Sequence, residues 1–408
     1  MASEFKLLDI YEQNLNFLIG AGASYGFLPT LALEAKDEIG NKYTFETLAK
    51  KYESNEQATK LLFMLYYQEC IRDGLPKVFS SIPPNPNRTP EQESVVHEYK
   101  RFLSNLINVL NRQKPSERRA NIFTTNYDNC FETATEELLS ERAAKFIVND
   151  GSVGFQKRTF HTSNFNHRVV NKGAFDRHDT LLPQVNLLHA HGSVHWEQGQ
   201  SDNEINLNYG QSSYIIIFEQ NELDIIRAFK GLLYDSTKSL SDIEDFLRSC
   251  DFSNLRLDYF WDKYTSIPIV NPTKWKFHET LFEEAYYQIL RHLSYELERP
   301  NSVLITFGFS FADEHLLSLI RRALSNPSLT MYVSCFNNDE LISMQDKFKD
   351  YSNVGYICSE EGDLDFKHFN DAKFTLDNYD RKSVRQDSIE PTPPSFLSSE
   401  VAPYGGEQ

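Results

Sequence analysis

The chain alternates between two hydrophobic patterns. Short apolar runs, typical of strands buried on both faces of a sheet, occur in residues 15–19, 121–128, 184–196, 267–272, 302–311 and 329–336. Apolar residues at helical spacing fill much of the intervening chain, in residues 44–73, 91–113, 130–142, 223–264, 279–297, 313–324 and 340–350. Strands that alternate with helices predict a parallel sheet with helices on both faces, which is an α/β fold.

The same patterns divide the chain into one large domain and a tail. We assign residues 1–376 to the sheet domain and expect helical insertions near residues 44–113 and 223–264. The polar stretch from Phe146 to Thr180 predicts a further insertion in extended or loop form. In residues 377–408 the composition shifts to Ser, Pro, Asp and Gln, which predicts a flexible tail or an arm that binds a partner.

The first apolar run ends in an abrupt glycine turn, Gly20-Ala21-Gly22-Ala23-Ser24. Glycines directly after a buried strand let the backbone turn tightly and let a phosphate approach the peptide N–H groups. The spacing is one residue longer than the G-x-G-x-x-G dinucleotide fingerprint. The turn therefore also fits a structural role without a ligand.

Three further polar turns follow apolar runs of the expected sheet. They are Thr124-Thr125-Asn126-Tyr127-Asp128, His191-Gly192-Ser193 and the segment from Gly308 to Asp313. Because the carboxyl ends of parallel strands meet at one edge of a sheet, these turns and the glycine turn can line a single crevice. We therefore expect a nucleotide site at that edge.

The composition excludes several classes of function. The chain has 408 residues, of which 40% are hydrophobic and 24% charged, and its formal net charge is -17. Binding to a nucleic-acid backbone needs a basic stripe, and the basic clusters here are small, so we expect no direct binding to nucleic acid. No apolar run approaches the ~20 residues that span a bilayer, so we expect no membrane segment.

The cysteines and histidines do not indicate a metal site. Cys70, Cys130, Cys250, Cys335 and Cys358 are scattered and contain no C-x-x-C pair. They indicate neither a disulfide framework nor a thiolate zinc site, and a reducing cytoplasm fits them best. Zinc bound through His189, His191 and His195 is conceivable, but alternate histidines on one strand are a pattern of low specificity, so we expect no metal.

Taken in order, the four turns resemble those of the sirtuin superfamily. The similarity lies in the Gly-Ala-Gly-x-Ser loop at Gly20, the Thr-x-Asn-x-Asp turn at Thr124, the His-Gly turn at His191 and the Gly-x-Ser loop at Gly308. Residues 269–272 look like the late asparagine turn of the family, which contacts the adenine-side ribose. The resemblance covers about half of the chain. It implies a Rossmann-like NAD site at which the bond between nicotinamide and ribose is cleaved.

Two departures from the family pattern narrow the resemblance. The sequence lacks the four-cysteine zinc module of the deacylating sirtuins, and residues 26–30 replace their Pro-Asp-Phe-Arg stretch. The chain is therefore more similar to the sirtuin-like NAD hydrolases of bacterial anti-phage defence. Its length and terminal extensions resemble the members that occur beside a HerA-type hexameric ATPase. This resemblance implies NAD as the substrate, a homo-oligomer, and such an ATPase as a candidate partner.

The resemblance also implies a role for each matched residue. Asn126 would fix the ribose hydroxyls or orient the attacking water, and His191 would accept a proton from a ribose hydroxyl or from the water. Asp128 would orient neighbouring groups. The diphosphate would contact Gly20, Ala21, Gly22 and Ser24, and the adenosine half would contact Asn271, Gly308 and Ser310.

Plain structural roles compete with some of these assignments. Asn126 could cap the following helix, as asparagine often does at a strand-to-helix turn, and Asp313 could cap the helix that begins beside it. His189 alternates with Ala190 along its strand and fits a buried, packed histidine. His195 fits packing beside the next residue, a tryptophan.

Three functions remain open on the sequence alone. The first is an NAD glycohydrolase that yields nicotinamide and ADP-ribose, depletes NAD in anti-phage defence, and is gated by oligomerisation with a partner. The second is a non-catalytic scaffold that senses NAD or ADP-ribose and regulates a partner ATPase. The third, disfavoured by the missing cysteines, is an NAD-dependent protein deacylase.

Overall fold

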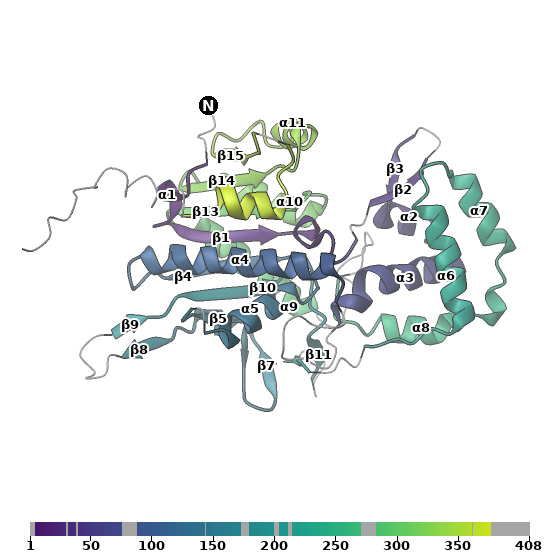
Figure 1. Cartoon of the computed structure of the whole chain (residues 1–408), viewed down its shortest axis with the longest axis horizontal. Coiled ribbons are helices and arrows are strands. Elements are labelled where there is room, and N and C mark those ends of the chain that lie inside the picture. Colours follow the sequence, from purple (N-terminus) through teal and green to yellow (C-terminus); the bar gives the residue numbers. More distant parts are fainter. Residues whose placement is uncertain are drawn as a thin grey trace, which may run out of the picture.

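The computed structural model describes residues 5–29, 32–37, 40–75, 88–142, 144–172, 179–199, 204–210, 214–270, 283–360 and 362–376. Two predictions, the tail at residues 377–408 and the nucleotide contact at Asn271, lie outside these ranges. Figure 1 shows the described chain as a central sheet flanked by helices, with a mainly helical lobe beside it.

A seven-stranded parallel sheet forms the centre of the molecule, in the order β15-β14-β13-β1-β4-β10-β5. The strands are β1 (Asn14–Ile19), β4 (Arg119–Thr124), β5 (Ile147–Asn149), β10 (Gln184–His189), β13 (Ser302–Phe307), β14 (Leu329–Ser334) and β15 (Val354–Ile357). The α/β prediction is confirmed. The fold is Rossmann-like, and β1, the strand before the glycine turn, lies at the middle of the sheet.

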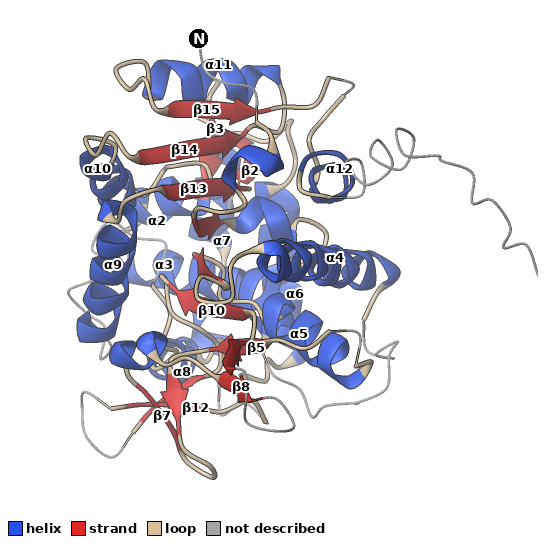
Figure 2. Ribbon diagram, turned by 90° about the vertical axis from the view of Figure 1, so that its left-hand side faces the viewer, coloured by secondary structure: helices blue, strands red, loops and turns tan. Residues whose placement is uncertain are grey.

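Helices cover both faces of this sheet. On one face, Phe17 and Ile19 of β1 pack in a common core with α4 (Pro90–Arg112) and α5 (Cys130–Ser140). On the other face, Leu18 packs in a core with α9 (Glu283–Glu298) and α10 (Glu314–Ala323). Figure 2 shows these two helix layers on opposite sides of the strands. Successive side chains of a strand point to opposite faces, so the apolar residues of β1 contribute to both cores.

The start of α4 follows from its sequence. Thr89 caps the helix: its side chain accepts from the Gln92 N–H, and the Gln92 side chain accepts from the Thr89 N–H. Pro90, which has no N–H to satisfy, occupies the first helical position. The other helices of the sheet domain are α1 (Leu7–Ile10), α11 (Asn338–Lys347) and α12 (Phe366–His368).

Two stretches that are far apart in sequence form the second lobe and share one core. The first supplies β2 (Ala32–Lys36), β3 (Lys42–Thr44), α2 (Phe45–Lys51) and α3 (Glu56–Tyr66). The second supplies α6 (Gln220–Leu233), α7 (Leu240–Ser249) and α8 (Leu257–Tyr264). Helix α3 contacts α6 and α8, and the Phe63 ring lies 5.2 Å from that of Tyr264. Both regions are helical as expected. However, α4, which we included in the first insertion, packs on the sheet instead.

The lobe lies next to the carboxyl edge of the sheet, toward which β1 and β10 point in Figure 1. Tyr127, in the turn after β4, packs against the lobe core, and its ring centroid is 6.5 Å from that of Tyr66 on α3. Val194, which follows β10, belongs to the same core. The two insertions therefore flank the edge at which the polar turns were expected.

One loop prediction needs correction. Part of the stretch from Phe146 to Thr180 belongs to the central sheet, because β5 is its edge strand and pairs with β10. Other short strands form a small antiparallel sheet in the order β11-β12-β7-β6. The short strands are β6 (Ser152–Val153), β7 (Arg158–Phe160), β8 (Val170–Lys172), β9 (Asp179–Leu181), β11 (Trp196–Gln198) and β12 (Ile205–Leu207).

Candidate active site

The four polar turns follow four adjacent strands, β13, β1, β4 and β10. The register aligns the last residues of these strands, Phe307, Ile19, Thr124 and His189. Backbone hydrogen bonds continue past the strand ends, from Thr125 N to Ile19 O at 3.0 Å and from Ala190 N to Thr124 O at 2.8 Å. The turns therefore share one edge, as the sequence predicted.

The glycine turn lies where the direction of sheet assembly reverses. From β1 the chain adds β4, β5 and β10 on one side, and then passes through α9 to β13 on the other side of β1. Helices α4 and α5 cover one face, and α9 and α10 cover the other. Ligands of open α/β sheets bind at such a switch point, outside the carboxyl ends of the strands.

At this point the glycine turn packs directly on the loop after β13. The Gly22 N–H donates to the Gly308 carbonyl oxygen at 2.9 Å. A Cβ on Gly20 would lie 2.5 Å from that oxygen, and a Cβ on Gly22 would lie 2.7 Å from Gly308 Cα. Gly308 itself has a φ of 62°, in the left-handed region that favours glycine. All three glycines are therefore needed for the close approach of the two loops.

This contact revises the role that the sequence suggested for the turn. The Gly20 N–H donates to Phe307 O and the Gly22 N–H donates to Gly308 O, so both groups already have acceptors. Ala21 is exposed and begins the 3₁₀ turn Ala21–Ser24, and the first N–H groups of such a turn have no partner within it. Ala21 is therefore the main donor that the turn still offers. Binding of a diphosphate here stays a prediction.

The Asn126 side chain is turned toward the glycine turn. Its Nδ2 lies 3.0 Å from Gly20 O, 3.1 Å from Ser24 Oγ and 3.3 Å from Tyr99 Oη. A carbonyl oxygen only accepts, so the atom that faces Gly20 O must be the amide nitrogen. Asn126 therefore does not cap α5. The atom that its side chain has left for a ligand is the amide oxygen, an acceptor.

Ser24 contacts the Asn126 side chain directly, and Asp128 in turn binds Ser24. Ser24 Oγ lies 2.6 Å from Asp128 Oδ2 and 2.7 Å from Tyr99 Oη, and Asp128 Oδ1 accepts from Cys130 N. The Ser24 hydroxyl thus donates to Asp128 and accepts from Tyr99 and Asn126, which uses its one hydrogen. Both Ser24 and Asp128 are buried. Burial raises the pKa of Asp128, and the hydrogen bonds from Ser24 and Cys130 oppose that rise.

These contacts revise two assignments made from the sequence. We expected Ser24 to donate to the diphosphate, but its hydrogen is committed to Asp128. We expected Asp128 to orient its neighbours, and its two oxygens do so, one through Ser24 and one at the start of α5. Neither side chain is directed to a ligand, and both instead position Asn126.

His191 forms a pair with an aspartate from the far side of the site. His191 Nε2 lies 3.1 Å from Asp313 Oδ2, while Asp313 Oδ1 caps α10 by accepting from the N–H groups of His315 and Leu316. Neighbouring strands are about 4.8 Å apart, so β10 and β13 are separated by roughly 14 Å. The pair therefore spans the ends of β1 and β4, the strands that carry the glycine turn and Asn126.

The Asp313 carboxylate also selects the tautomer of His191. With an ionised acceptor beside Nε2, the neutral ring carries its hydrogen on Nε2 and keeps a lone pair on Nδ1. The side chains of His191 and Asp313 are 14% and 5% exposed, so the pair is largely shielded from water. His191 is thus oriented as a proton acceptor through Nδ1.

The turn at His191 is braced by the segment 267–270. This segment is buried as expected, although it forms a single antiparallel bridge, between Ile269 and Gly192, rather than a strand. The Val270 N–H donates to His191 O at 2.8 Å. Gly192 has a φ of 85°, and a Cβ there would lie 2.0 Å from Pro268 O. Val270, the residue before Asn271, is thus hydrogen-bonded to the turn at His191. Asn271 itself lies outside the described residues.

Ser310 is not brought to the other site candidates. It is exposed in the loop between Gly308 and Asp313, and its carbonyl oxygen accepts from Lys347 Nζ of α11 at 3.1 Å. The loop anchors itself through Phe309 and Phe311, which are buried in the core beneath it. Contact of Ser310 with the adenosine half stays a prediction.

His189 and His195, the two histidines on either side of His191, are buried as expected, but their surroundings differ. His189 Nδ1 lies 3.2 Å from Asn126 O, and its Nε2 lies 2.9 Å from Glu132 Oε1. Burial lowers the pKa of His189, but the Glu132 carboxylate, the Asn126 carbonyl and Asp128 together outweigh it, and the net shift is upward. The His195 ring packs against that of Tyr209, with the ring centroids 4.6 Å apart and the planes tilted by 47°, and burial lowers the pKa of His195. No local pattern in the sequence indicates the contact between His189 and Asn126.

Two other site residues were also missed. Tyr99 lies on the buried face of α4, where an aromatic residue indicates only core packing, yet its hydroxyl joins the Asn126 cluster. Asp313 was assigned to capping alone, and it also binds His191. The Tyr99 ring packs in the core and Asp313 Oδ1 caps α10, as the sequence suggested. The Tyr99 hydroxyl contacts Asn126, and Asp313 Oδ2 contacts His191.

The described part of the chain shows no metal cluster and no membrane helix, and comparison with known families and curated proteins identifies no relative. Within the described ranges, no group of three or more His, Cys, Asp or Glu side chains is placed to hold a metal ion. None of the helices that the structure describes is long and apolar enough to cross a membrane. No protein-family model matches the chain, and no curated protein matches it at a significant level. Function must therefore be argued from the site.

Proposed function

We propose that this protein is an NAD glycohydrolase, which cleaves the nicotinamide–ribose bond of NAD to give nicotinamide and ADP-ribose. One observation carries the proposal: an acceptor amide at Asn126 and an oriented histidine at His191 follow adjacent strands beside the switch point of a Rossmann-like sheet. Nucleotides bind at that position in such folds. The resemblance of the four turns to sirtuin loops supports the choice of NAD.

Hydrolysis of the nicotinamide–ribose bond requires few protein groups. Nicotinamide in NAD is cationic and leaves as a neutral molecule with the electron pair of the C–N bond, which builds oxocarbenium character on the ribose. A water oxygen then bonds to the ribose carbon and loses a proton. The Asn126 amide oxygen would accept a hydrogen bond from a ribose hydroxyl or from this water. His191 Nδ1 would take the proton, and Asp313 would stabilise the resulting imidazolium.

The biological setting that we propose rests on the resemblance. Depletion of NAD by a triggered hydrolase would serve anti-phage defence. A hydrolase that was active at rest would be toxic to its own cell, so a gate is needed. Assembly into a homo-oligomer with a HerA-type ATPase would supply that gate.

The test is a product assay on the purified full chain. The protein is incubated with NAD, alone and together with the candidate ATPase, and nicotinamide and ADP-ribose are measured by chromatography. Asn126→Ala and His191→Ala should each lower the rate by at least about a hundredfold, the usual contribution of a general base. The matched controls Asn171→Ala and His161→Ala change exposed side chains outside the site and should keep full activity.

Each outcome has a defined meaning. Absence of nicotinamide release under both conditions would refute the proposal. Tight binding of ADP-ribose without turnover would favour the NAD-sensing scaffold instead. Formation of acetyl-ADP-ribose from an acetylated peptide would favour the deacylase.

A further inference from the structure

His189 contacts the candidate catalytic turn from the protein interior. It is the last residue of β10, and its side chain is 7% exposed. One ring nitrogen, Nδ1, faces the backbone carbonyl of Asn126 at 3.2 Å, and the other, Nε2, faces Glu132 Oε1 at 2.9 Å. The imidazole thus links the backbone of Asn126 to the first turn of α5.

The two contacts determine the charge of this ring. A backbone carbonyl accepts and never donates, so Nδ1 must carry a hydrogen. Glu132 lies in the first turn of α5, where the helix dipole favours an ionised carboxylate. An ionised carboxylate also only accepts, so Nε2 must carry a hydrogen as well. With both nitrogens protonated, His189 is an imidazolium.

The charged groups around His189 favour its positive form. Burial raises the pKa of Glu132, but His189, together with smaller effects of His195 and a backbone hydrogen bond, outweighs it, and the net shift is downward. Asp128, in the turn after β4, adds a second carboxylate near the ring and favours its positive form. His195, in the turn after β10, lies with Nε2 at 3.9 Å from Glu132 Oε1, beyond hydrogen-bond distance. Burial lowers its pKa, so it does not compete as a cation.

We propose that His189 is a positioning residue: as an imidazolium held by Glu132, it fixes the Asn126 carbonyl and so sets the direction of the Asn126 side chain. The backbone N–H of Asn126 is bound to Thr124 Oγ1 at 3.0 Å, and its side-chain nitrogen is bound to the glycine turn. The bond from His189 completes this restraint. The geometry and charge stand on their own, and only the catalytic consequence rests on the proposed function.

The consequence is a loss of function at alkaline pH. Because the pKa of His189 is raised in the folded state, the imidazolium is complete below its ordinary value near 6.5 and is lost as pH rises through the higher folded value. The neutral ring keeps one hydrogen and can no longer donate to both partners. The Asn126 carbonyl or Glu132 then loses its hydrogen bond.

The charge can be tested without any enzyme assay. Nitrogen-15 NMR of the imidazoles, with His189→Gln to assign the signal, should show both His189 nitrogens protonated at pH 7. In Glu132→Gln the same signal should become that of a neutral ring, because the attracting charge is gone. A neutral His189 in the unmodified protein would overturn the proposal, whatever the protein catalyses.

The positioning role is tested by the pH profile of NAD hydrolysis. Glu132→Gln should lower kcat at pH 8 by tenfold or more, move the alkaline limb to lower pH by at least one unit, and leave KM within about twofold. His195→Gln is the matched control, a buried neighbour of the same carboxylate without contact to Asn126, and it should leave the limb in place. An unmoved limb in Glu132→Gln would refute the role. Lack of hydrolysis by the unmodified protein would refute the proposed function and leave the NMR result intact.

Discussion

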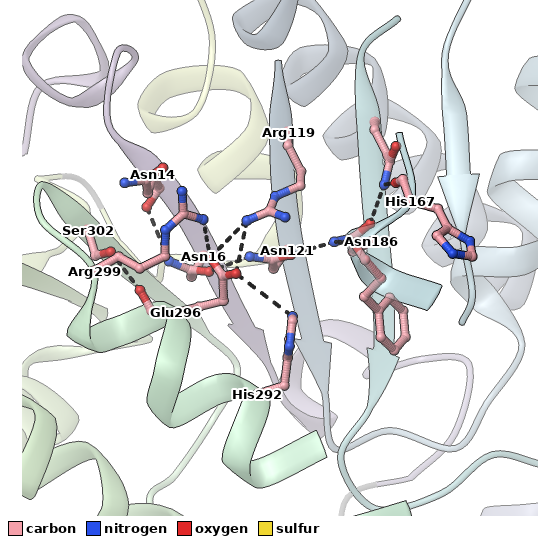
Figure 3. A network of polar contacts seen from close by, with 12 residues as sticks. Asn14, Asn16, Arg119, Asn121, His167, Asn186, His292, Glu296, Arg299 and Ser302 are labelled. Carbon is pink, nitrogen blue, oxygen red and sulfur yellow. Dashed lines mark hydrogen bonds and ion pairs between the residues drawn. The ribbon is translucent and has the colours of Figure 1, made fainter. Parts of the chain in front are cut away.

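The amino half and the carboxyl edge of the same sheet carry polar clusters of opposite kinds. In the amino half, Asn16, Asn121 and Asn186 lie in register on adjacent strands, and all three are buried. Asn121 Nδ2 donates to Asn16 Oδ1, and Asn186 Nδ2 donates to Asn121 Oδ1, each at 2.8 Å (Figure 3). Gln184 Nε2 completes the row by donating to Asn186 Oδ1 at 2.8 Å. The amides form a chain that is satisfied from within.

An ion cluster lies at the same end of the sheet. Arg119 Nη2 lies 2.9 Å and 3.1 Å from the two carboxylate oxygens of Glu296 on α9, and Arg299 Nη1 lies 2.8 Å from one of them. Figure 3 shows this cluster beside the asparagine row. The carboxyl edge differs, because Asn126 Oδ1 and His191 Nδ1 have no hydrogen-bond partner within the described part of the chain, while the other polar atom of each side chain is bound to the protein. Buried polar groups are costly unless they are paired, so the paired asparagine row stabilises the sheet, while the unpaired atoms at the carboxyl edge mark the candidate site.

The largest expected effect tests whether the carboxyl edge is open for catalysis. Asp313→Asn keeps an oxygen to cap α10 but places an amide N–H beside His191 Nε2, which favours the tautomer with its hydrogen on Nδ1. The proton acceptor is then lost, and kcat for NAD hydrolysis should fall about a thousandfold, roughly 4 kcal/mol on the barrier. KM and the melting temperature should change little.

Asp365→Asn is the matched control, because Asp365 also caps a helix with its side chain. It should leave kcat unchanged. An equal loss in the two variants would show that capping, rather than the tautomer, explains the effect, and would weaken the assignment of His191 as the base.

The second prediction tests the closed row. Asn121→Leu removes the donor to Asn16 Oδ1 and the nearer acceptor of Asn186 Nδ2, which keeps only its 3.4 Å contact with Phe165 O. At about 1–3 kcal/mol for each group, the free energy of unfolding should fall by roughly 2–6 kcal/mol. Urea denaturation measures this loss. The residual folded protein should bind ADP-ribose as before, and a selective loss of binding would place the row in the site.

The third prediction tests the contact of the two loops at the switch point. Gly308→Ala forces an alanine to a φ of 62° and puts its Cβ 2.5 Å from Ala23 N, while Gly362→Ala meets only the conformational cost at a φ of 79°, with no atom within 4 Å. We expect the free energy of unfolding to fall by about 3 kcal/mol in Gly308→Ala and by about 1 kcal/mol in Gly362→Ala. Thermal unfolding of the two variants measures the difference. Equal losses would mean that the loops separate easily.

The prediction with the smallest effect compares the hydroxyl groups of two fully buried tyrosines, Tyr99 and Tyr66. Tyr99→Phe removes a hydroxyl that Ser24 and Asn126 use, and should lower the free energy of unfolding by about 1 kcal/mol. In Tyr66→Phe the lost hydroxyl is buried and has no hydrogen-bond partner in the described part of the chain, so the change should be near zero or stabilising. Parallel denaturation curves test this, and equal costs would show that the Tyr99 hydroxyl is not held by the cluster.

Much of the fold was readable because local patterns dictate it. The apolar run before Gly20 matches β1, the helical spacing after Thr89 matches α4, and the strand at Ser302 matches β13. The edge strand β5 was missed, because three residues give too short a pattern to distinguish from a loop. The union of the two insertions into one lobe was missed as well, because two helical segments carry no sign of which partner they pack against.

The site was readable in position but not in detail. The turns after β1, β4, β10 and β13 could be named from the sequence, since each apolar run ends abruptly in glycine or polar residues and the carboxyl ends of parallel strands share one edge. The function of individual atoms could not be named. Ser24 was assigned to the ligand and is instead held by Asp128, because its orientation depends on a tyrosine from α4.

The sequence by itself determined the parallel sheet, its two helix layers and the four polar turns, because hydrophobic period and glycine placement act over a few neighbouring residues. Only the tertiary structure decided which polar atoms are satisfied within the protein and which remain for a ligand. Hydrogen bonds such as His191 to Asp313 and His189 to Glu132 join residues more than fifty positions apart. Their donors and acceptors meet only after the sheet has set the strand order and register.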